Sequence, residues 1–200
     1  MTPSSERPLP NHAALLAELA DEFPGFRIVA KQQSRLSRVF HFLLLACTFG
    51  GQRRYLTDFH TVIGRTLYVA DSWQKLPEVD RIILLEHERV HLRQGRRLSL
   101  VGMALIYLLP FFPLGLAYGR ARLEWEAYTA TLRATAELKG IEAARALRPA
   151  IVRRFCSADY GWMWPFPVTV NRWYARVIAQ IEAEVGAGRP RAVHGKVEDS

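Results

Sequence analysis

Residues 77–97 read PEVDRIILLEHERVHLRQGRR and combine the clearest helix signals in the chain with its most chemically specific motif. Pro77 is typical of a first helical position, and Glu78 and Asp80 suit the positive N-terminal end of a helix. Arginines gather toward the other end, where positive charge is favoured. The pattern predicts a helix across this stretch, and the remaining elements are placed relative to it.

The motif inside this helix is H-E-x-x-H, formed by His87, Glu88 and His91. Residues four apart lie one above the other on a helix, so both imidazoles can point at one metal ion. Glu88 is offset by one position, from which its carboxylate can reach a water on that ion without being a ligand itself. The spacing therefore indicates a metal site with Glu88 as the general base of a hydrolytic reaction.

A zinc site of this kind needs a third protein ligand. One class of H-E-x-x-H enzymes supplies a histidine six residues after the second motif histidine, but Arg97 stands there. The alternative is a carboxylate on a later helix, for which Glu124 and Glu126 are the candidates. Residues two apart point to different sides of a helix, so only one of these two can bind the ion.

The H-E-x-x-H motif followed by E-x-x-A-Y, which begins at Glu124, resembles the gluzincin metallopeptidases. It looks most like the membrane zinc peptidases that include the prenyl-protein (CaaX) proteases and HtpX. The resemblance implies a zincin-like peptidase that holds one Zn²⁺ per chain through His87, His91 and Glu124. Glu126 remains the alternative third ligand.

Two tyrosines are candidates for supporting roles. Tyr128 occupies the position at which the resembled family has a residue that orients a ligand, and its phenol can do so by donating a hydrogen bond. Tyr160 lies in the aromatic, proline-punctuated segment 156–167 and could donate to the oxyanion of a hydrolytic reaction. Packing is the commoner role of such a segment.

The rest of the chain predicts an α+β, mainly helical fold with a small sheet before the H-E-x-x-H helix. Asn11 can cap a first helix, which ends before Pro24 and Gly25. We expect one zincin-like domain over residues 11–185, with disordered tails at 1–10 and 186–200. Further helices are expected at 33–48, 120–140, 142–155 and 170–185, and strands at 55–60 and 66–70.

Residues 98–118 form an apolar segment without a charged residue, long enough as one straight helix to cross a bilayer. A single crossing would leave His91 and Glu124 on opposite sides of the membrane, where they could not share an ion. If Glu124 is the ligand, the segment must turn back, and the prolines at 110 and 113 can supply the bend. Two alternatives stay open, namely an interfacial hairpin on anionic lipid and a hairpin buried in the protein core.

The composition and the N-terminal sequence restrict the expected binding partners and the expected cellular compartment. The 200 residues carry a net charge of +8 and are 50% hydrophobic, which excludes disorder as a whole and favours an anionic neighbour. Basic and aromatic residues are not interleaved, so nucleic acid is not expected. The two cysteines form no metal or disulfide framework. No signal peptide is recognisable, and we expect the cytoplasm or the cytoplasmic face of a membrane.

The sequence therefore predicts a zinc metalloendopeptidase that acts on a peptide or protein substrate. Two alternatives remain from other classes. One is a zinc-binding domain without catalysis that recognises a partner, and the other is a basic, membrane-associated scaffold whose histidines bind no metal.

Overall fold

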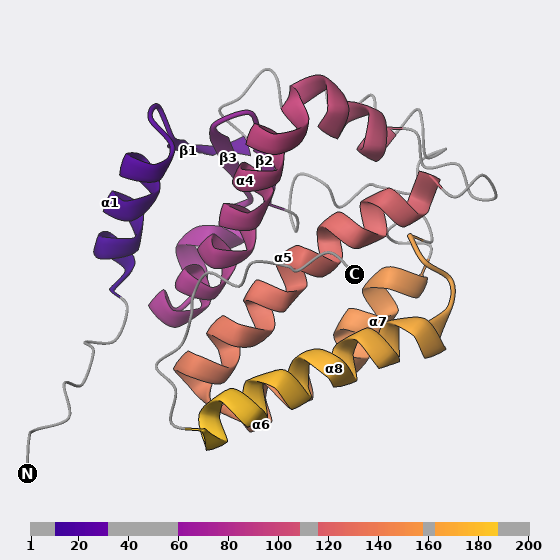
Figure 1. Cartoon of the computed structure of the whole chain (residues 1–200). Coiled ribbons are helices and arrows are strands. Elements are labelled where there is room, and N and C mark those ends of the chain that lie inside the picture. The colour runs from indigo at the N-terminus through magenta and orange to yellow at the C-terminus, as the bar shows by residue number, and fades with distance from the viewer. Residues whose placement is uncertain (1–10, 32–59, 109–115, 158–162, 188–200) are drawn as a thin grey trace, which may run out of the picture.

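The computed structural model describes residues 11–31, 60–108, 116–157 and 163–187. Over these residues the chain is mainly helical with a small three-stranded sheet, so the predicted α+β class is confirmed. Figure 1 shows α1, the sheet and α4 on one side of α5, and α6, α7 and α8 on the other. The predicted helix at 33–48, most of the predicted strand at 55–60, the bend at 110–113 and the predicted tail at 1–10 lie outside the described residues. So does the tail predicted at 186–200, except for residues 186 and 187, and Gly186 still belongs to the last helix.

The first helix, α1 (His12–Glu22), begins as the sequence predicts. The Asn11 side chain accepts a hydrogen bond from the backbone N–H of Ala13 at 2.7 Å, which caps one of the free donors at the helix start. Leu15 and Leu19 are buried on one face of this helix. The turn that follows contains Gly25 at a φ of 87°, and leads directly into a strand.

The sheet has the order β1-β3-β2, and its strands are β1 (Arg27–Ala30), β2 (Thr61–Ile63) and β3 (Thr66–Val69). The central strand β3 is buried along its whole length, pairs in parallel with β1 and pairs antiparallel with β2. Strand β3 confirms the strand that the sequence predicts at 66–70. Strand β1 was not predicted from the sequence. The strand before the turn at Gly64 begins at Thr61, after His60, because the β-branched residues are at 61–63.

Helix α4 (Glu78–Leu108) follows the short 3₁₀ helix η2 (Asp71–Lys75) and carries the H-E-x-x-H motif. Its helical path is broken at Ser99, where φ is 61° and ψ is 165°. The Ser99 hydroxyl accepts a hydrogen bond from the N–H of Gly102 at 3.3 Å, in the manner of a helix cap. The break divides α4 into a motif-bearing part and an apolar extension.

Helix α5 (Leu116–Lys139) returns along α4. A Cβ placed on Gly119 would lie 3.7 Å from Cγ2 of Ile106, so the start of α5 runs against the extension of α4. Within residues 98–118, none of the side chains whose exposure the structure describes is buried, and the turn between the two helices lies outside the described residues. No helix in the described part of the chain combines the length and the apolar character that a membrane crossing requires.

Three further helices, α6 (Ile141–Ala146), α7 (Arg148–Cys156) and α8 (Pro167–Gly186), complete the fold. The single helix predicted at 142–155 is two helices that meet at Leu147. Pro149 explains the division, because proline fits the first turn of a helix and not its interior. For the same reason α8 begins at Pro167, three residues before the predicted start.

The buried apolar residues form two separate clusters. The sheet cluster joins α1, β3, η2 and the first part of α4, and the helical cluster joins α5, α6, α7 and α8. The sheet cluster comprises Leu15, Leu19, Phe23, Leu67, Val69, Trp73, Ile82, Leu85 and Leu92. The helical cluster includes Trp125, Tyr128, Leu132, Ile151, Phe155, Val170, Tyr174 and Ile181.

Arg89, a middle residue of the H-E-x-x-H motif, ties α4 to α1. Its side chain is only 7% exposed, and it forms ion pairs with Glu22 at 2.6 Å and with Glu18 at 3.1 Å. Arg93, one helical turn later, binds the same Glu22 carboxylate at 2.6 Å. The face of α4 opposite the histidines is therefore fixed to α1 by charge as well as by apolar packing.

Candidate metal centre

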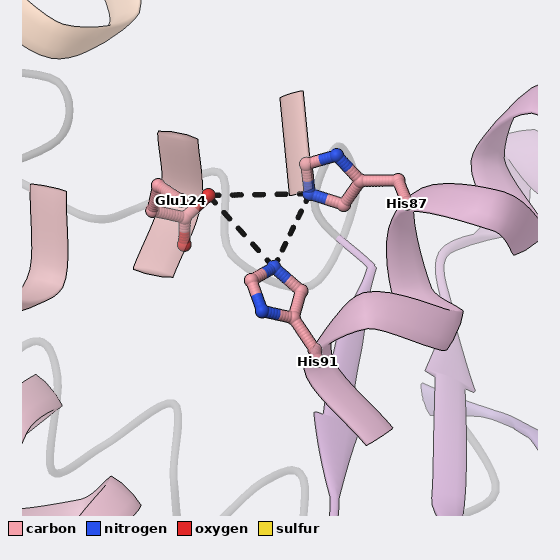
Figure 2. A group of neighbouring side chains, drawn as sticks. All are labelled: His87, His91 and Glu124. Carbon is pink, nitrogen blue, oxygen red and sulfur yellow. Dashed lines mark hydrogen bonds and ion pairs between the residues drawn. The ribbon is translucent and has the colours of Figure 1, made fainter. Parts of the chain in front are cut away.

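Three side chains from two helices converge on one point (Figure 2). His87 and His91 extend from successive turns of α4, and their Nε2 atoms lie 3.2 Å apart. Glu124 extends from α5, and its Oε2 lies 3.9 Å from each of those nitrogens. The pair of histidines comes from the helix that packs on the sheet cluster, whereas the carboxylate comes from the helix that packs in the helical cluster.

The separations of these three atoms suit a metal ion. Atoms so spaced lie on a circle with a radius of about 2.1 Å, and usual Zn–N and Zn–O distances are about 2.0–2.2 Å. Two imidazoles and one carboxylate are also the donor set of many catalytic zinc sites, which leave a further position open. The group could therefore hold a divalent ion without rearrangement of the helices.

A threonine on α5 sets the orientation of the first histidine. The Thr131 hydroxyl donates its proton to the carbonyl of Ala127 at 3.3 Å, so it can only accept from Nδ1 of His87, at 3.0 Å. The proton of the neutral imidazole is then on Nδ1, and the Nε2 lone pair faces His91 and Glu124. Metal-binding histidines are commonly held by such a hydrogen bond from the other ring nitrogen.

A glutamine on α4 orients the second histidine in the same way. The amide nitrogen of Gln94 donates to the carbonyl of Leu123 and to the carboxylate of Glu126, both at 2.9 Å. Two acceptors on that side fix the amide, so its Oε1 accepts from Nδ1 of His91, at 2.9 Å. Gln94 is 2% exposed, and it connects a candidate ligand on α4 to the backbone beside Glu124 on α5.

The two candidate carboxylates are placed differently. Glu124 Oε2 faces both histidines, whereas Glu126 accepts from Gln94 and has its other oxygen 3.9 Å from Arg97. Both side chains reach residues of α4, but only Glu124 faces the two histidines. Among the described residues, the group able to hold a metal contains Glu124 and not Glu126.

Glu88 lies beside this group and is 5% exposed. The pKa of its carboxyl is raised to about 7, mainly by burial and also by Glu124, while His91 and Lys31 oppose the rise. Lys31, directly after β1, is fully buried and donates from Nζ to the Thr61 hydroxyl at 3.1 Å. Burial lowers the pKa of its amine to about 7, against the attraction of Glu88. The sheet thus brings a buried amine to the side of the site that carries Glu88.

The surroundings keep His87 neutral. Burial, with a contribution from the neighbouring His91, lowers the pKa of its imidazole to about 3, although Glu124 opposes the decrease. A neutral imidazole is the form that binds a metal ion. The edge of the Tyr128 ring packs against His87 with centroids 5.0 Å apart, and the Tyr128 hydroxyl accepts from Arg154 at 3.0 Å.

Sequence reasoning identified the residues that converge and missed those that orient them. Gln94 follows His91 by three positions and Thr131 follows Glu124 by seven, so helical periodicity alone places each on a useful face. Lys31 and Arg154 gave no such signal, because their positions depend on contacts between distant segments. Tyr160 lies outside the described residues. His60 lies before β2, where its Nδ1 accepts from the Ala70 N–H at 3.4 Å.

Comparison with known proteins does not identify a family for this chain. No protein-family model matches the chain, and neither a curated protein nor a solved structure matches it.

Proposed function

We propose that this protein is a zinc-dependent metallopeptidase whose centre is formed by His87, His91 and Glu124. The observation that carries the proposal is the convergence of three ligand atoms beside a buried glutamate on the same helix as the histidines. Zinc is the metal of choice because two imidazoles with one carboxylate suit it, whereas calcium and magnesium prefer oxygen ligands alone.

The chain divides the chemistry among a few residues. Bound zinc would act as a Lewis acid that polarises the peptide carbonyl and makes a water more acidic. Glu88 would accept a proton from the attacking water while the water oxygen bonds to the carbonyl carbon. The same carboxyl would then give that proton to the amide nitrogen as the carbon–nitrogen bond breaks. A carboxyl whose pKa lies near neutrality can perform both transfers.

The supporting residues have positioning roles. Thr131 and Gln94 would hold the two imidazoles with their Nε2 atoms toward the ion. In its protonated form Lys31 would place positive charge near Glu88, which favours the ionised form of that carboxyl before it accepts a proton.

Glu88→Gln tests the proposed function, because it keeps the shape of the side chain and removes its basicity. We expect hydrolysis of a broad peptide library by the zinc-loaded wild type, and a decrease of about 100- to 10,000-fold in the variant. Zinc content should stay the same, since Glu88 is not among the proposed ligands. Glu86→Gln, two residues earlier on α4, is the matched control and should retain activity.

Full activity of Glu88→Gln would exclude the mechanism. A wild-type chain that binds zinc and cleaves no peptide in the library would instead favour a metal-binding domain without catalysis.

A further inference from the structure

Exposed apolar side chains gather where three helices begin or end on one side of the molecule. The extension of α4, the start of α5 and the start of α8 all lie toward the right in Figure 1. Five of the six large apolar side chains that are exposed among the described residues belong to these three ends. We call this set the apolar tip, and it comprises Val101 (69% exposed), Leu105 (54%), Tyr118 (42%), Phe166 (47%) and Val168 (64%).

Ring contacts join parts of the apolar tip into one surface. Tyr118 packs on Trp164 with centroids 5.0 Å apart, and Trp164 packs on Phe166 at 5.2 Å. The start of α5 also runs against the extension of α4 at Ile106. Val101 and Leu105, four residues apart, share one face of that extension. Segments distant in sequence therefore present their apolar side chains together.

The charged residues on the segments that carry the apolar tip have one sign. Arg122 follows Tyr118 by four residues on α5, and Arg172 follows Val168 by four on α8, so each helix carries an exposed arginine one turn behind an exposed apolar residue. Arg97, before the break in α4, has a side chain that is 66% exposed. In residues 97–108, 116–123 and 163–176, every charged residue is an arginine.

We propose that the apolar tip and its arginines dock on the surface of an anionic lipid bilayer. The apolar side chains would enter the boundary between headgroups and acyl chains, while the arginines one turn behind would lie at the level of the phosphates. Aromatic residues such as Tyr118 and Trp164 favour the same boundary. A second copy of this face would oppose arginine with arginine, so self-association through it is electrostatically unfavourable.

Docking in this orientation would bring the candidate metal centre close to the lipid surface. Tyr118 and Glu124 lie on the same helix six residues apart, which corresponds to about 9 Å of axial rise. The docking itself requires neither a metal nor hydrolysis, and it can be tested without either.

The test measures sedimentation of the purified full chain with vesicles made of equal parts of phosphatidylcholine and phosphatidylglycerol. We expect binding to these vesicles that weakens as salt is added, and little binding to vesicles of phosphatidylcholine alone. Val168→Glu should weaken binding by about tenfold or more, because it removes an apolar contact and adds a repelled charge. Arg172→Gln should weaken binding by about fivefold and reduce the salt dependence.

Val185→Glu is the matched control. Val185 is 62% exposed, lies on the same helix as Val168 and belongs to the opposite end of that helix, outside the apolar tip. The Val185→Glu variant should bind the vesicles as the wild type does. Equal binding by the two valine variants would overturn the proposal, as would the absence of any preference for anionic vesicles. If the wild-type chain does not bind the vesicles but forms a dimer, and Val168→Glu restores the monomer, the surface would be assigned to contact with a second copy of the chain instead.

Discussion

The sheet cluster and the helical cluster contribute to the candidate metal centre in different ways. The sheet cluster supports the part of α4 that bears both histidines and Glu88, with α1 fixed behind it by apolar packing and ion pairs. The helical cluster supports α5, which provides Glu124. One body therefore holds the proposed base and two proposed ligands on a single helix, and the other provides the carboxylate that completes the group.

Hydrogen bonds from α4 to α5 cross the boundary between the two bodies. Thr131 on α5 holds His87 on α4, and Gln94 on α4 holds His91 while it donates to Leu123 on α5. One histidine is thus held directly from α5, and the other is held by a glutamine that is itself hydrogen-bonded to α5. The comparison implies that metal binding is coupled to the packing of α4 against α5, and that substitutions at the boundary affect both.

The largest expected effect separates the two carboxylates on α5. We expect Glu124→Ala to weaken zinc binding by more than about 100-fold, because it removes a proposed ligand. The loss of a residue that only orients a ligand should have a smaller effect. Glu126→Ala is the matched control on the same helix, and it should change the affinity by less than tenfold or so, through Gln94 alone. Competition titration with a zinc-sensitive dye measures both. Selective loss in Glu126→Ala would transfer the ligand role to that residue.

A second expectation is that zinc stabilises the fold by joining the two bodies. At a free zinc concentration of about 100 times the Kd, the unfolding free energy should rise by about 2.7 kcal/mol, since the unfolded chain lacks the arranged ligands. Thermal melting with zinc and after chelation measures the shift. Glu124→Ala should melt at the same temperature in both conditions. A zinc-dependent shift that persists in this variant would place the ion elsewhere.

Removing one orienting hydrogen bond should have a smaller effect. Thr131→Val keeps the volume of the side chain and removes the acceptor for His87, and we expect zinc affinity to fall by about 10- to 100-fold. Thr129→Val is the control, because the Thr129 hydroxyl donates within its own helix, to the carbonyl of Trp125 at 2.9 Å. Equal affinities for the two variants would show that Thr131 does not orient the ligand.

The parts of this arrangement that follow from local sequence were predictable. The cap at Asn11, the strand β3 and the helix that carries H-E-x-x-H rest on short-range signals, and residues four apart share a helix face wherever the helix lies. The spacing of Glu124 and Glu126 alone predicts that only one of them is a ligand. The choice between them depends on the rotation of α5, which the burial of Trp125, Tyr128 and Leu132 sets in the helical cluster.

The parts that sequence reasoning missed depend on distant contacts. The parallel pairing of β1 with β3 brings Lys31 to the Glu88 side of the centre, and no local pattern predicts it. The apolar run at 98–118 gave no sign of the break at Ser99, because serine is an unusual residue at positive φ. That break turns an apolar run into a short extension with an exposed face.

The smallest expected effect is confined to one body. Burial by itself raises the pKa of the Glu22 carboxyl, but hydrogen bonds from Arg93 and Arg89 outweigh it, and the pKa is lowered overall. A lowered pKa in the folded state means that these bonds stabilise the fold fully above the ordinary carboxyl pKa. That stabilisation is lost as pH falls through the folded-state value.

Glu22→Gln should therefore lower the unfolding free energy by about 1 kcal/mol near neutral pH, a modest loss because Arg89 keeps Glu18 and Glu86 as partners. The difference from wild type should shrink in acid, where the wild-type carboxyl is also protonated. Denaturant unfolding of both proteins across this pH range measures it. Zinc affinity should not change, since α1 lies behind α4 and away from Glu124. A weakened zinc site in Glu22→Gln would mean that the ion pairs behind the motif also set the position of the histidines, and that the sheet-supported body is less rigid than its packing implies.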